Sequence, residues 1–258
     1  MLIKEKVDDI LIITLNRPEK RNALNPQLIK QLHQIVKELK LKDDIFGLLL
    51  TGSGNTFCAG ADLEYLESLL HKSFDEHLED SRDLKNLFYD IFTLPKPVVA
   101  LVNGPALAGG CGLANVCDYA IASKDARFGY PEVKIGFTAA IVSVFLMHTV
   151  GLYQAKQLLM EGEIFDSQRA LELGLIKKIV KSEELGKCGI EFINELRSAS
   201  ASSLALTKQL LLQLNQQSIE SALEAACRAN AEARMRPDFR EGVRSFLEKR
   251  KPRWGNRE

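Results

Sequence analysis

Two short glycine-rich segments are candidates for chemistry, because each follows a strand-like run and precedes a helix-like run. The first reads Thr-Phe-Cys-Ala-Gly-Ala-Asp-Leu over residues 56–63, and the second runs from Asn103 to Asp118. A strand, a turn and a helix start leave backbone N–H groups without partners, so each turn can bind an oxyanion or a phosphate. Taken singly, the first turn is better explained by an ordinary helix start with Asp62 as the N-cap, and the alternative for the second turn is close helix-on-sheet packing through small residues.

Together the two turns predict a site for a developing negative charge. If both direct N–H groups at one point, they can hold one carbonyl oxygen, and each well-placed donor lowers a barrier by roughly 3 kcal/mol. Such an arrangement suits the enolate of a thioester. Nucleotide binding is a weak alternative, because the G-x-x-x-x-G-K-[ST] loop is absent and no G-x-G-x-x-G follows the first strand.

The composition is that of an ordinary globular protein. Hydrophobic residues make up 46% and charged residues 26% of the 258 residues, which is ample for a packed core. The 34 Lys plus Arg residues equal the 34 Asp plus Glu residues, so no net charge favours nucleic acid or an anionic membrane. No apolar run reaches the ~20 residues that span a bilayer, and the start at Met1 lacks a signal-peptide core. We expect a cytoplasmic protein with no nucleic-acid or membrane partner.

The spacing of cysteines and histidines predicts neither disulfides nor a metal site. An odd number of cysteines without C-x-x-C spacing is best explained by reduced thiols, as in the cytosol. No histidine stands at metal-ligand spacing from another His, Asp or Glu. Cys111 has no partnered base in the sequence and is predicted to be a small packing residue. The residues considered are Cys58, Cys111, Cys117, Cys188, Cys227, His33, His71, His77 and His148.

Alternating strand-like and helix-like runs predict an α/β fold for the first part of the chain. Residues 27–39 place apolar side chains on one face at helical spacing. A polar segment at 71–83, with His77 and Asp80, is expected to be a mobile wall of the site. Short apolar runs predict strands at 10–15, 46–50, 97–102, 119–122 and 176–180.

The second part of the chain changes character. From about Ser182 the pattern is helical almost throughout, with apolar stripes, and Pro237 is expected at a helix start. The pattern therefore divides the chain into an α/β core at residues 1–195 and a helical region at 196–258.

Five segments resemble the crotonase superfamily, also called the enoyl-CoA hydratase/isomerase family. The resemblance covers nearly the whole chain, and it is specific because the segments follow the family order. It implies a spiral of ββα units with a helical C-terminal oligomerisation region, assembled as a homotrimer or a dimer of trimers. It also implies an acyl-CoA thioester as the substrate, with no other cofactor. The segments are Asn16–Leu24, Phe57–Leu63, Asn103–Asp118, Phe128–Glu132 and Phe246–Arg250.

The resemblance assigns a role to each candidate. The backbone N–H groups of Ala61 and Gly109 would form the oxyanion hole, and Glu132 would be the catalytic acid or base. A glutamate after a proline is otherwise most simply a surface group, and the matching segment is what favours catalysis. Phe246 and Lys249 would close the CoA site, which in this family is often that of a neighbouring subunit. The other implied CoA contacts are Lys20, Arg21, Ala23, Ala59, Asp62 and Leu63.

Gly112 is the most informative departure from the family pattern. Two-glutamate hydratases of the family carry their other glutamate at this position. Two carboxylates divide the tasks of activating water and delivering a proton, whereas one carboxylate suits the isomerisation of a Δ3-enoyl thioester. However, the residues around Gly112 and Glu132 are similar to a branch that hydrates branched or carboxylated enoyl-CoAs, such as methylglutaconyl-CoA. In that branch a glycine here and a lone glutamate are usual, although Thr138 departs from the branch's frequent proline.

Several functions therefore stay open. Hydration of a 2-enoyl-CoA is preferred over isomerisation of a 3-enoyl-CoA. A non-catalytic acyl-CoA-binding protein is the alternative suggested by the absent second glutamate, and thioester hydrolysis or decarboxylation would use the same oxyanion hole. RNA binding is a distant possibility, because the net charge is zero.

Overall fold

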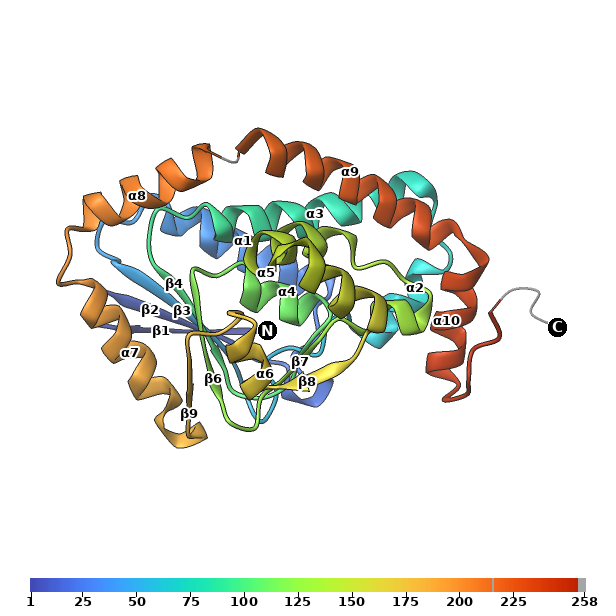
Figure 1. The fold of residues 1–258 in the computed structure, drawn as a ribbon, viewed down its shortest axis with the longest axis horizontal. Coiled ribbons are helices and arrows are strands. Elements are labelled where there is room, and N and C mark those ends of the chain that lie inside the picture. Colours follow the sequence, from blue (N-terminus) through green and yellow to red (C-terminus); the bar gives the residue numbers. More distant parts are fainter. Residues whose placement is uncertain (215, 255–258) are drawn as a thin grey trace.

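The protein, seen here as a computed structural model, is described over residues 1–214 and 216–254. Its main sheet has six strands in the order β1-β2-β3-β4-β6-β9, in which only the pair β1 and β2 is antiparallel (Figure 1). A smaller sheet has the order β5-β7-β8. The strands are β1 Leu2–Val7, β2 Ile10–Leu15, β3 Gly47–Gly52, β4 Val98–Val102, β5 Ala106–Leu107, β6 Tyr119–Ser123, β7 Arg127–Gly129, β8 Ile164–Asp166 and β9 Lys178–Val180.

Helices and 3-10 turns separate most of the strands, as the α/β prediction requires. The helix expected at 27–39 is α1, which starts at Pro26 after Asn25 accepts a hydrogen bond from the Leu28 N–H at 2.8 Å. The helices are α1 Pro26–Leu39, α2 Leu63–Leu69, α3 Phe74–Phe92, α4 Gly109–Asn115, α5 Ala140–Glu161, α6 Ser167–Glu172, α7 Leu185–Leu196, α8 Ala201–Gln213, α9 Gln216–Met235 and α10 Pro237–Leu247, and the 3-10 turns are η1 Pro18–Lys20, η2 Pro131–Ile135 and η3 Ser182–Glu184.

Both faces of the main sheet are buried, which explains the continuous apolar strands. In β3, Leu48 and Leu50 join the core formed with α1 and α3, whereas Leu49 points to the opposite face and packs with α7. Successive side chains of a strand alternate between faces, so a strand covered on both sides needs an apolar residue at every position. The sheet thus holds the glycine turns at the ends of its central strands between two packed layers.

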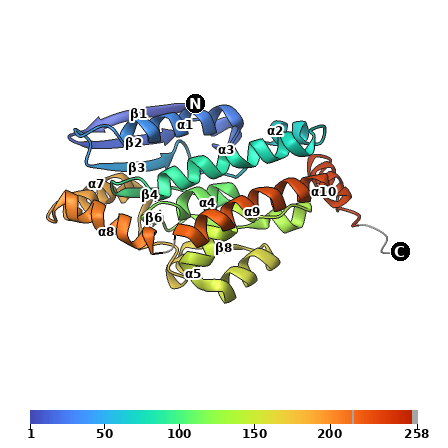
Figure 2. The ribbon, with the colours of Figure 1, turned by 90° about the horizontal axis from the view of Figure 1, so that it is seen from above.

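The C-terminal helices pack in different ways. Helix α9 runs alongside α3 and also contacts α5, while α10 packs against η2 and α2 (Figure 2). Helix α8 buries none of its residues within the chain. The helical character of the C-terminal part and the helix start at Pro237 are confirmed, whereas the division of the chain at residue 195 stays a prediction.

The polar segment at 71–83 is where the prediction of a mobile wall was wrong. Most of it is the first half of α3, which begins with a capping box between Ser73 and Glu76. His77 and Ser81 are buried, with 1% and 0% of their surfaces exposed. The helix was not predicted because its buried face contains polar residues, so the apolar spacing typical of a helix is interrupted there.

Candidate active site

The two glycine turns lie against each other through their backbones. The N–H of Leu107 donates to the carbonyl of Cys58 at 2.9 Å, and Cys58 and Ala106 form an isolated parallel bridge. A Cβ atom placed on Gly110 would lie only 2.1 Å from the Cys58 oxygen, so the position excludes any side chain. Gly60 has φ +92°, and a Cβ there would lie 2.9 Å from the Cβ of Ala108. The glycines are required because they let the two turns approach this closely.

Ala108 has a strained backbone immediately before the second candidate donor. Its φ and ψ angles are 52° and −125°, and its N–H donates to the carbonyl of Gly129 at 2.8 Å. Such a conformation of a residue other than glycine costs of order 1–3 kcal/mol, and it is typical of functional sites. It places Gly109 at the first position of α4, where an N–H has no carbonyl within the helix to bond.

The N–H groups of Ala61 and Gly109 are the two predicted oxyanion donors. Neither donates to a backbone carbonyl elsewhere in the described part of the chain. Ala61 is exposed and Gly109 is half-buried, so both can be reached by a ligand. The turns that carry them are in direct contact, so the two N–H groups belong to neighbouring turns, and their role as oxyanion donors stays a prediction.

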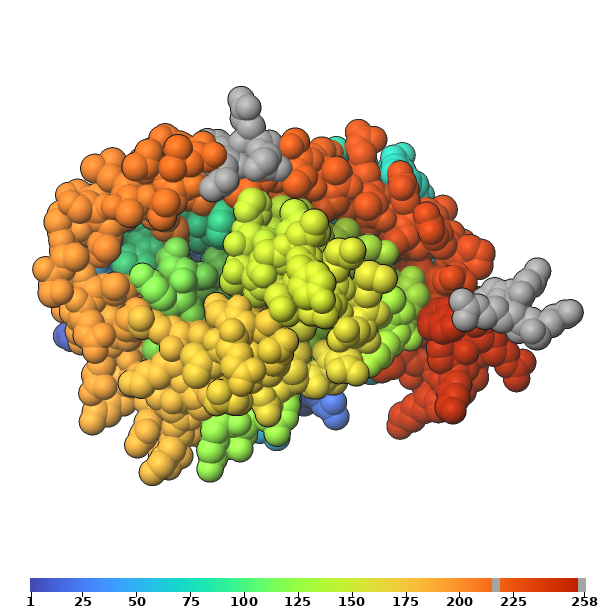
Figure 3. All heavy atoms as spheres, in the orientation of Figure 1, coloured from blue at the N-terminus to red at the C-terminus, as the bar shows by residue number. Residues whose placement is uncertain are grey.

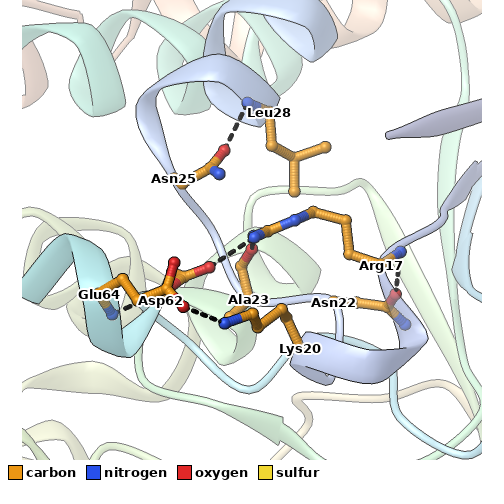
Figure 4. Close-up of polar contacts among 8 residues, drawn as sticks. All are labelled: Arg17, Lys20, Asn22, Ala23, Asn25, Leu28, Asp62 and Glu64. Atoms are coloured by element: carbon orange, nitrogen blue, oxygen red, sulfur yellow. Dashed lines mark hydrogen bonds and ion pairs between the residues drawn. The ribbon is translucent and has the colours of Figure 1, made fainter.

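The segment Asn16–Leu24, which we call the first loop, packs against the turn that carries Ala61, and Figure 4 shows its Arg17 beside Asp62. Leu24 bonds to both chain neighbours of Ala61. Its N–H donates to the Gly60 carbonyl at 2.7 Å, and its carbonyl accepts from the Asp62 N–H at 2.8 Å. Arg17 then donates to the Asp62 carboxylate at 2.5 Å and to the Ala23 carbonyl at 2.6 Å. The Arg17 and Asp62 side chains are only 10% and 4% exposed, so this ion pair is buried.

Sequence reasoning missed this role of Arg17. Asp62 is the N-cap of α2, as predicted, since its carboxylate accepts from the Glu64 N–H at 3.0 Å. A buried ion pair joining residues 45 positions apart leaves no local pattern, so only the first-loop segment itself marked Arg17 for attention.

Glu132 lies in η2, directly after the strand that pairs with the second turn. Strand β5 runs parallel to β7, with Leu107 opposite Gly129. The end of β7, which precedes Glu132, therefore lies beside the end of β5, which precedes Gly109. The Glu132 side chain is 5% exposed, and its Oε2 atom has no hydrogen-bond partner among the described residues. The expectation for an arbitrary glutamate, an exposed surface group, does not describe this one.

Burial sets the electrostatics of the site. It raises the pKa of Glu132 from 4.5 to about 7, because removing the carboxylate from water disfavours its charged form. A carboxyl group that titrates near neutral pH can both accept and donate a proton. Burial also raises the pKa of the Cys111 thiol to about 12, so this residue stays protonated and suits the packing role predicted for it.

The structure leaves no room for a second glutamate at Gly112. A Cβ atom there would lie 2.2 Å from Cγ1 of Val142 in α5 and 3.0 Å from Cε2 of Phe88 in α3. Contacts between carbon atoms are favourable at about 3.5–4.0 Å, so even a methyl group overlaps. The space beside the second turn is filled with apolar side chains, and Glu132 has no carboxylate opposite it from this position.

The residues predicted to contact CoA come from three segments of the chain, and not all of them are exposed. Lys20 is exposed and forms an ion pair with Glu64, while Leu63 is 48% exposed at the start of α2. Phe246, 50% exposed, and Lys249 lie at the end of α10, which packs on η2 and α2. Their contacts with CoA stay predictions. The remaining members of the set are Arg21, which is exposed, Ala59, which is half-buried, and Ala23 and Asp62, which are buried.

Within residues 1–214 and 216–254, no three His, Cys, Asp or Glu side chains come together as a metal site would require. No helix in these ranges is both long enough and apolar enough to cross a bilayer.

Comparison with known proteins points to one family. The family model for enoyl-CoA hydratase/isomerase matches residues 5–257. A Thermus thermophilus protein whose name assigns it to the enoyl-CoA hydratases is 40% identical over 98% of this chain and 100% of its own. The short-chain-enoyl-CoA hydratase of Clostridium acetobutylicum is 34% identical over 97% and 95%. The crystal structure of an enoyl-CoA hydratase from Mycobacterium avium matches with a TM-score of 0.87 at 30% identity, covering 98% of each chain.

Proposed function

Because the chain belongs to the enoyl-CoA hydratase/isomerase family, we propose that it adds water across the double bond of a 2-enoyl-CoA. The observation that carries this proposal is a buried carboxyl group with an oxygen that lacks a partner, which follows the strand paired with the turn of Gly109, while that turn contacts the turn of Ala61. The relatives named as hydratases support the choice of reaction.

The reaction needs charge stabilisation at one point of the substrate. The thioester carbonyl oxygen binds between the N–H groups of Ala61 and Gly109, and these donors stabilise the enolate that forms as water attacks Cβ. Each donor is worth roughly 3 kcal/mol to the barrier, because charge appears there only in the transition state.

Glu132 carries the proton transfers alone. Its carboxylate takes a proton from water while the water oxygen bonds to Cβ, and the resulting carboxylic acid returns a proton to Cα as the enolate collapses. The carbon–carbon double bond is lost, one molecule of water is added, and Glu132 ends in its starting state. A pKa of about 7 suits both halves of this exchange. No redox change occurs, so we propose that no cofactor besides the acyl-CoA substrate is needed.

Isomerisation of a 3-enoyl-CoA is the second candidate, and the filled space at Gly112 favours it specifically. Glu132 would then remove a proton from Cα and return it to Cγ through a dienolate. The ultraviolet absorbance of the conjugated enoyl thioester separates the two. A falling signal with crotonyl-CoA supports hydration, whereas a rising signal with a 3-enoyl-CoA and none with crotonyl-CoA would replace it by isomerisation. A branched 2-enoyl-CoA such as methylglutaconyl-CoA should be tested beside crotonyl-CoA, and its hydration stays a prediction.

An ultraviolet absorbance that changes with neither the 2-enoyl-CoAs nor the 3-enoyl-CoAs would favour another thioester reaction or a binding role. Equilibrium binding of a non-hydrolysable acyl-CoA analogue then distinguishes these, because a binding protein retains affinity for the analogue without turning over any thioester.

We also propose that α8 joins copies of this chain, as a homotrimer or a dimer of trimers in the cytoplasm. Leu206 and Leu210 of α8 and Leu214 directly after it are 63%, 55% and 72% exposed, and a large apolar surface of this kind marks an interaction site. The hollow beside α8, visible in Figure 3, has a volume of about 540 Å³ and is lined by Phe92, Tyr119, Leu204 and Leu211 among others.

Light scattering on a size-exclusion column tests the assembly. The double change Leu206→Glu with Leu210→Glu should reduce the mass to that of one chain while circular dichroism stays unchanged. A wild-type mass of 28.8 kDa, that of a single chain, would refute the proposal.

A further inference from the structure

A cluster of polar side chains lies buried between α3 and α9, which run side by side (Figure 2). Asn230 Nδ2 donates to Ser81 Oγ at 3.0 Å, and Arg234 Nη1 donates to Asp80 Oδ2 at 2.5 Å. His77, one helical turn before Ser81, is 1% exposed, while Asn230 and Arg234 are 3% and 7% exposed. We refer to these five residues as the α3–α9 polar cluster.

The cluster has more hydrogen-bonding groups than its members can satisfy. His77 Nδ1, Asn230 Oδ1 and Arg234 Nε are buried and have no hydrogen-bond partner within residues 1–214 and 216–254. Each such atom costs about 1–3 kcal/mol when it is buried unpaired. A contact that served only to join two helices would be stronger with apolar residues, so this excess of polar atoms indicates a ligand.

The hydrogen-bond pattern fixes what the cluster offers. Ser81 Oγ donates its only proton to the His77 carbonyl at 2.8 Å, so it must accept from the Asn230 amide nitrogen. The free Asn230 atom is therefore an acceptor, and the free Arg234 atom is an N–H donor. The positive charge of Arg234 is balanced by Asp80, and burial lowers the pKa of His77 to about 4, so His77 is neutral near pH 7.

The cluster adjoins the segment that carries Glu132. The Arg234 guanidinium lies 5.2 Å from the centre of the Phe137 ring. The Phe137 N–H donates to the Glu132 carbonyl at 3.0 Å. A single phenylalanine ring thus separates the cluster from the 3-10 turn that holds the catalytic carboxyl group.

Helix α3 connects the cluster with the second oxyanion turn. His77, Ser81 and Phe88 follow one another at spacings of four and seven residues, so they lie along one face of the helix. Phe88 is the residue that fills the space at Gly112. Seven residues of helix span about 10 Å, so Ser81, the member of the cluster nearest to Phe88 on this face, lies about one short acyl chain from that ring.

We propose that the α3–α9 polar cluster recognises an oxygen-bearing group, a hydroxyl or a carboxyl, at the distal end of a short 2-enoyl chain. This inference rests on the proposed function. The oxygen accepts a hydrogen bond from Arg234 Nε–H, a hydroxyl can also donate to Asn230 Oδ1, and a carboxylate can accept a second hydrogen bond from the Nδ1–H group of neutral His77. An alkyl end satisfies none of these atoms, so the cluster determines specificity without touching the reacting carbons.

Substrates of similar length but different ends test the proposal. The kcat/KM values for hydration of ω-hydroxyhex-2-enoyl-CoA and of the carboxyl-ended hex-2-enedioyl-CoA are compared with that of hept-2-enoyl-CoA. At least one oxygen-ended substrate should exceed the methyl-ended one by about tenfold or more, because unpaired site groups penalise the wrong substrate. The two oxygen-ended substrates show which terminus is taken. Equal or faster hydration of hept-2-enoyl-CoA would overturn the proposal.

Substitutions show whether the preference comes from the cluster. Asn230→Leu removes an unpaired acceptor from the core, so the fold should keep its stability while the preference for an oxygen end falls at least about threefold. Glu224→Gln is the matched control, because Glu224 joins the same two helices through an exposed pair with Arg82 at 2.6 Å. It should leave the preference unchanged. An unchanged preference in Asn230→Leu would assign the selectivity elsewhere and defeat the proposal.

Crotonyl-CoA distinguishes failure of the specificity proposal from failure of the proposed hydratase function. Its chain is too short to reach the cluster, so its hydration depends on Glu132 and the oxyanion donors alone. If crotonyl-CoA is hydrated and the oxygen-ended substrates show no advantage, the specificity proposal fails while the proposed function stands. If no 2-enoyl-CoA is hydrated, the proposed function fails first.

Discussion

Replacing Glu132 by glutamine should remove activity and stabilise the fold at the same time. Burial raises the pKa of this carboxyl group from 4.5 to about 7. At pH values between these two pKa values, Glu132 is protonated in the folded chain but ionised in the unfolded chain. The stability due to Glu132 is therefore fully present below about pH 4.5 and is lost as the pH rises through about 7. One pKa unit corresponds to about 1.4 kcal/mol, so the charged form costs the wild-type fold about 3 kcal/mol above that range.

Glutamine has nearly the same shape and carries no charge. The Glu132→Gln variant should therefore exceed the wild type in free energy of unfolding by up to about 3 kcal/mol at about pH 8, and the two should approach each other below about pH 4.5. Urea denaturation followed by circular dichroism at both pH values measures this difference. A variant no more stable than the wild type at the higher pH would refute the argument that an uncompensated buried charge is present.

The same variant should lose hydration of crotonyl-CoA by at least about a hundredfold, since it lacks the group that moves protons. Binding of acyl-CoA should persist, because the N–H groups of Ala61 and Gly109 belong to the backbone. Near-normal turnover would remove Glu132 from the mechanism. In the wild type, kcat/KM should rise with pH through about 7 as the carboxylate forms in the free enzyme, and a profile flat across that range would contradict its role as the base.

Further substitutions test the surroundings of the site. Arg17→Met leaves the buried Asp62 carboxylate unpaired and should lower the free energy of unfolding by about 3–5 kcal/mol. Glu64→Gln, which breaks the neighbouring exposed pair, should change it by less than about 1 kcal/mol, and equal effects would show that burial is unimportant there. Gly112→Ala should destabilise the fold by about 1–3 kcal/mol through overlap with Val142, as chemical denaturation would report. Adding Val142→Ala should recover most of that loss, and no recovery would point to another cause.

The layered fold could be predicted where the pattern of side chains was unambiguous. Strands β2, β3 and β4 are continuous apolar runs because both faces of the sheet are covered, and this is the pattern that the sequence displays. Strand β1 was not predicted, because it lies at the sheet edge and its sequence LIKEKV is largely exposed and charged. Helix α3 was not predicted, and its first half was instead predicted to be a mobile wall, because the buried face there includes His77 and Ser81.

The parts of the proposed site could be located in the sequence, whereas their surroundings could not, and the roles of these parts stay predictions. The glycine turns and Glu132 were identified because glycine spacing and the segment around the glutamate survive in the linear sequence. The burial that raises the Glu132 pKa, the Arg17–Asp62 pair and the α3–α9 polar cluster depend on residues distant along the chain. No local pattern encodes such contacts, so they became visible only when the elements were placed together.

The interlocking of the two glycine turns has a consequence for how such a protein can change over generations. Both proposed oxyanion donors are main-chain atoms, and Gly60 and Gly110 are packed so tightly that few replacements are tolerated. A substitution elsewhere cannot delete a peptide N–H, so the electrophilic half of the chemistry is inherited with the fold itself. The side chains on α3 and α9 are free of that constraint. Under the proposed function, new substrates would therefore be acquired by altering those helices, while the capacity to stabilise an enolate would pass on intact.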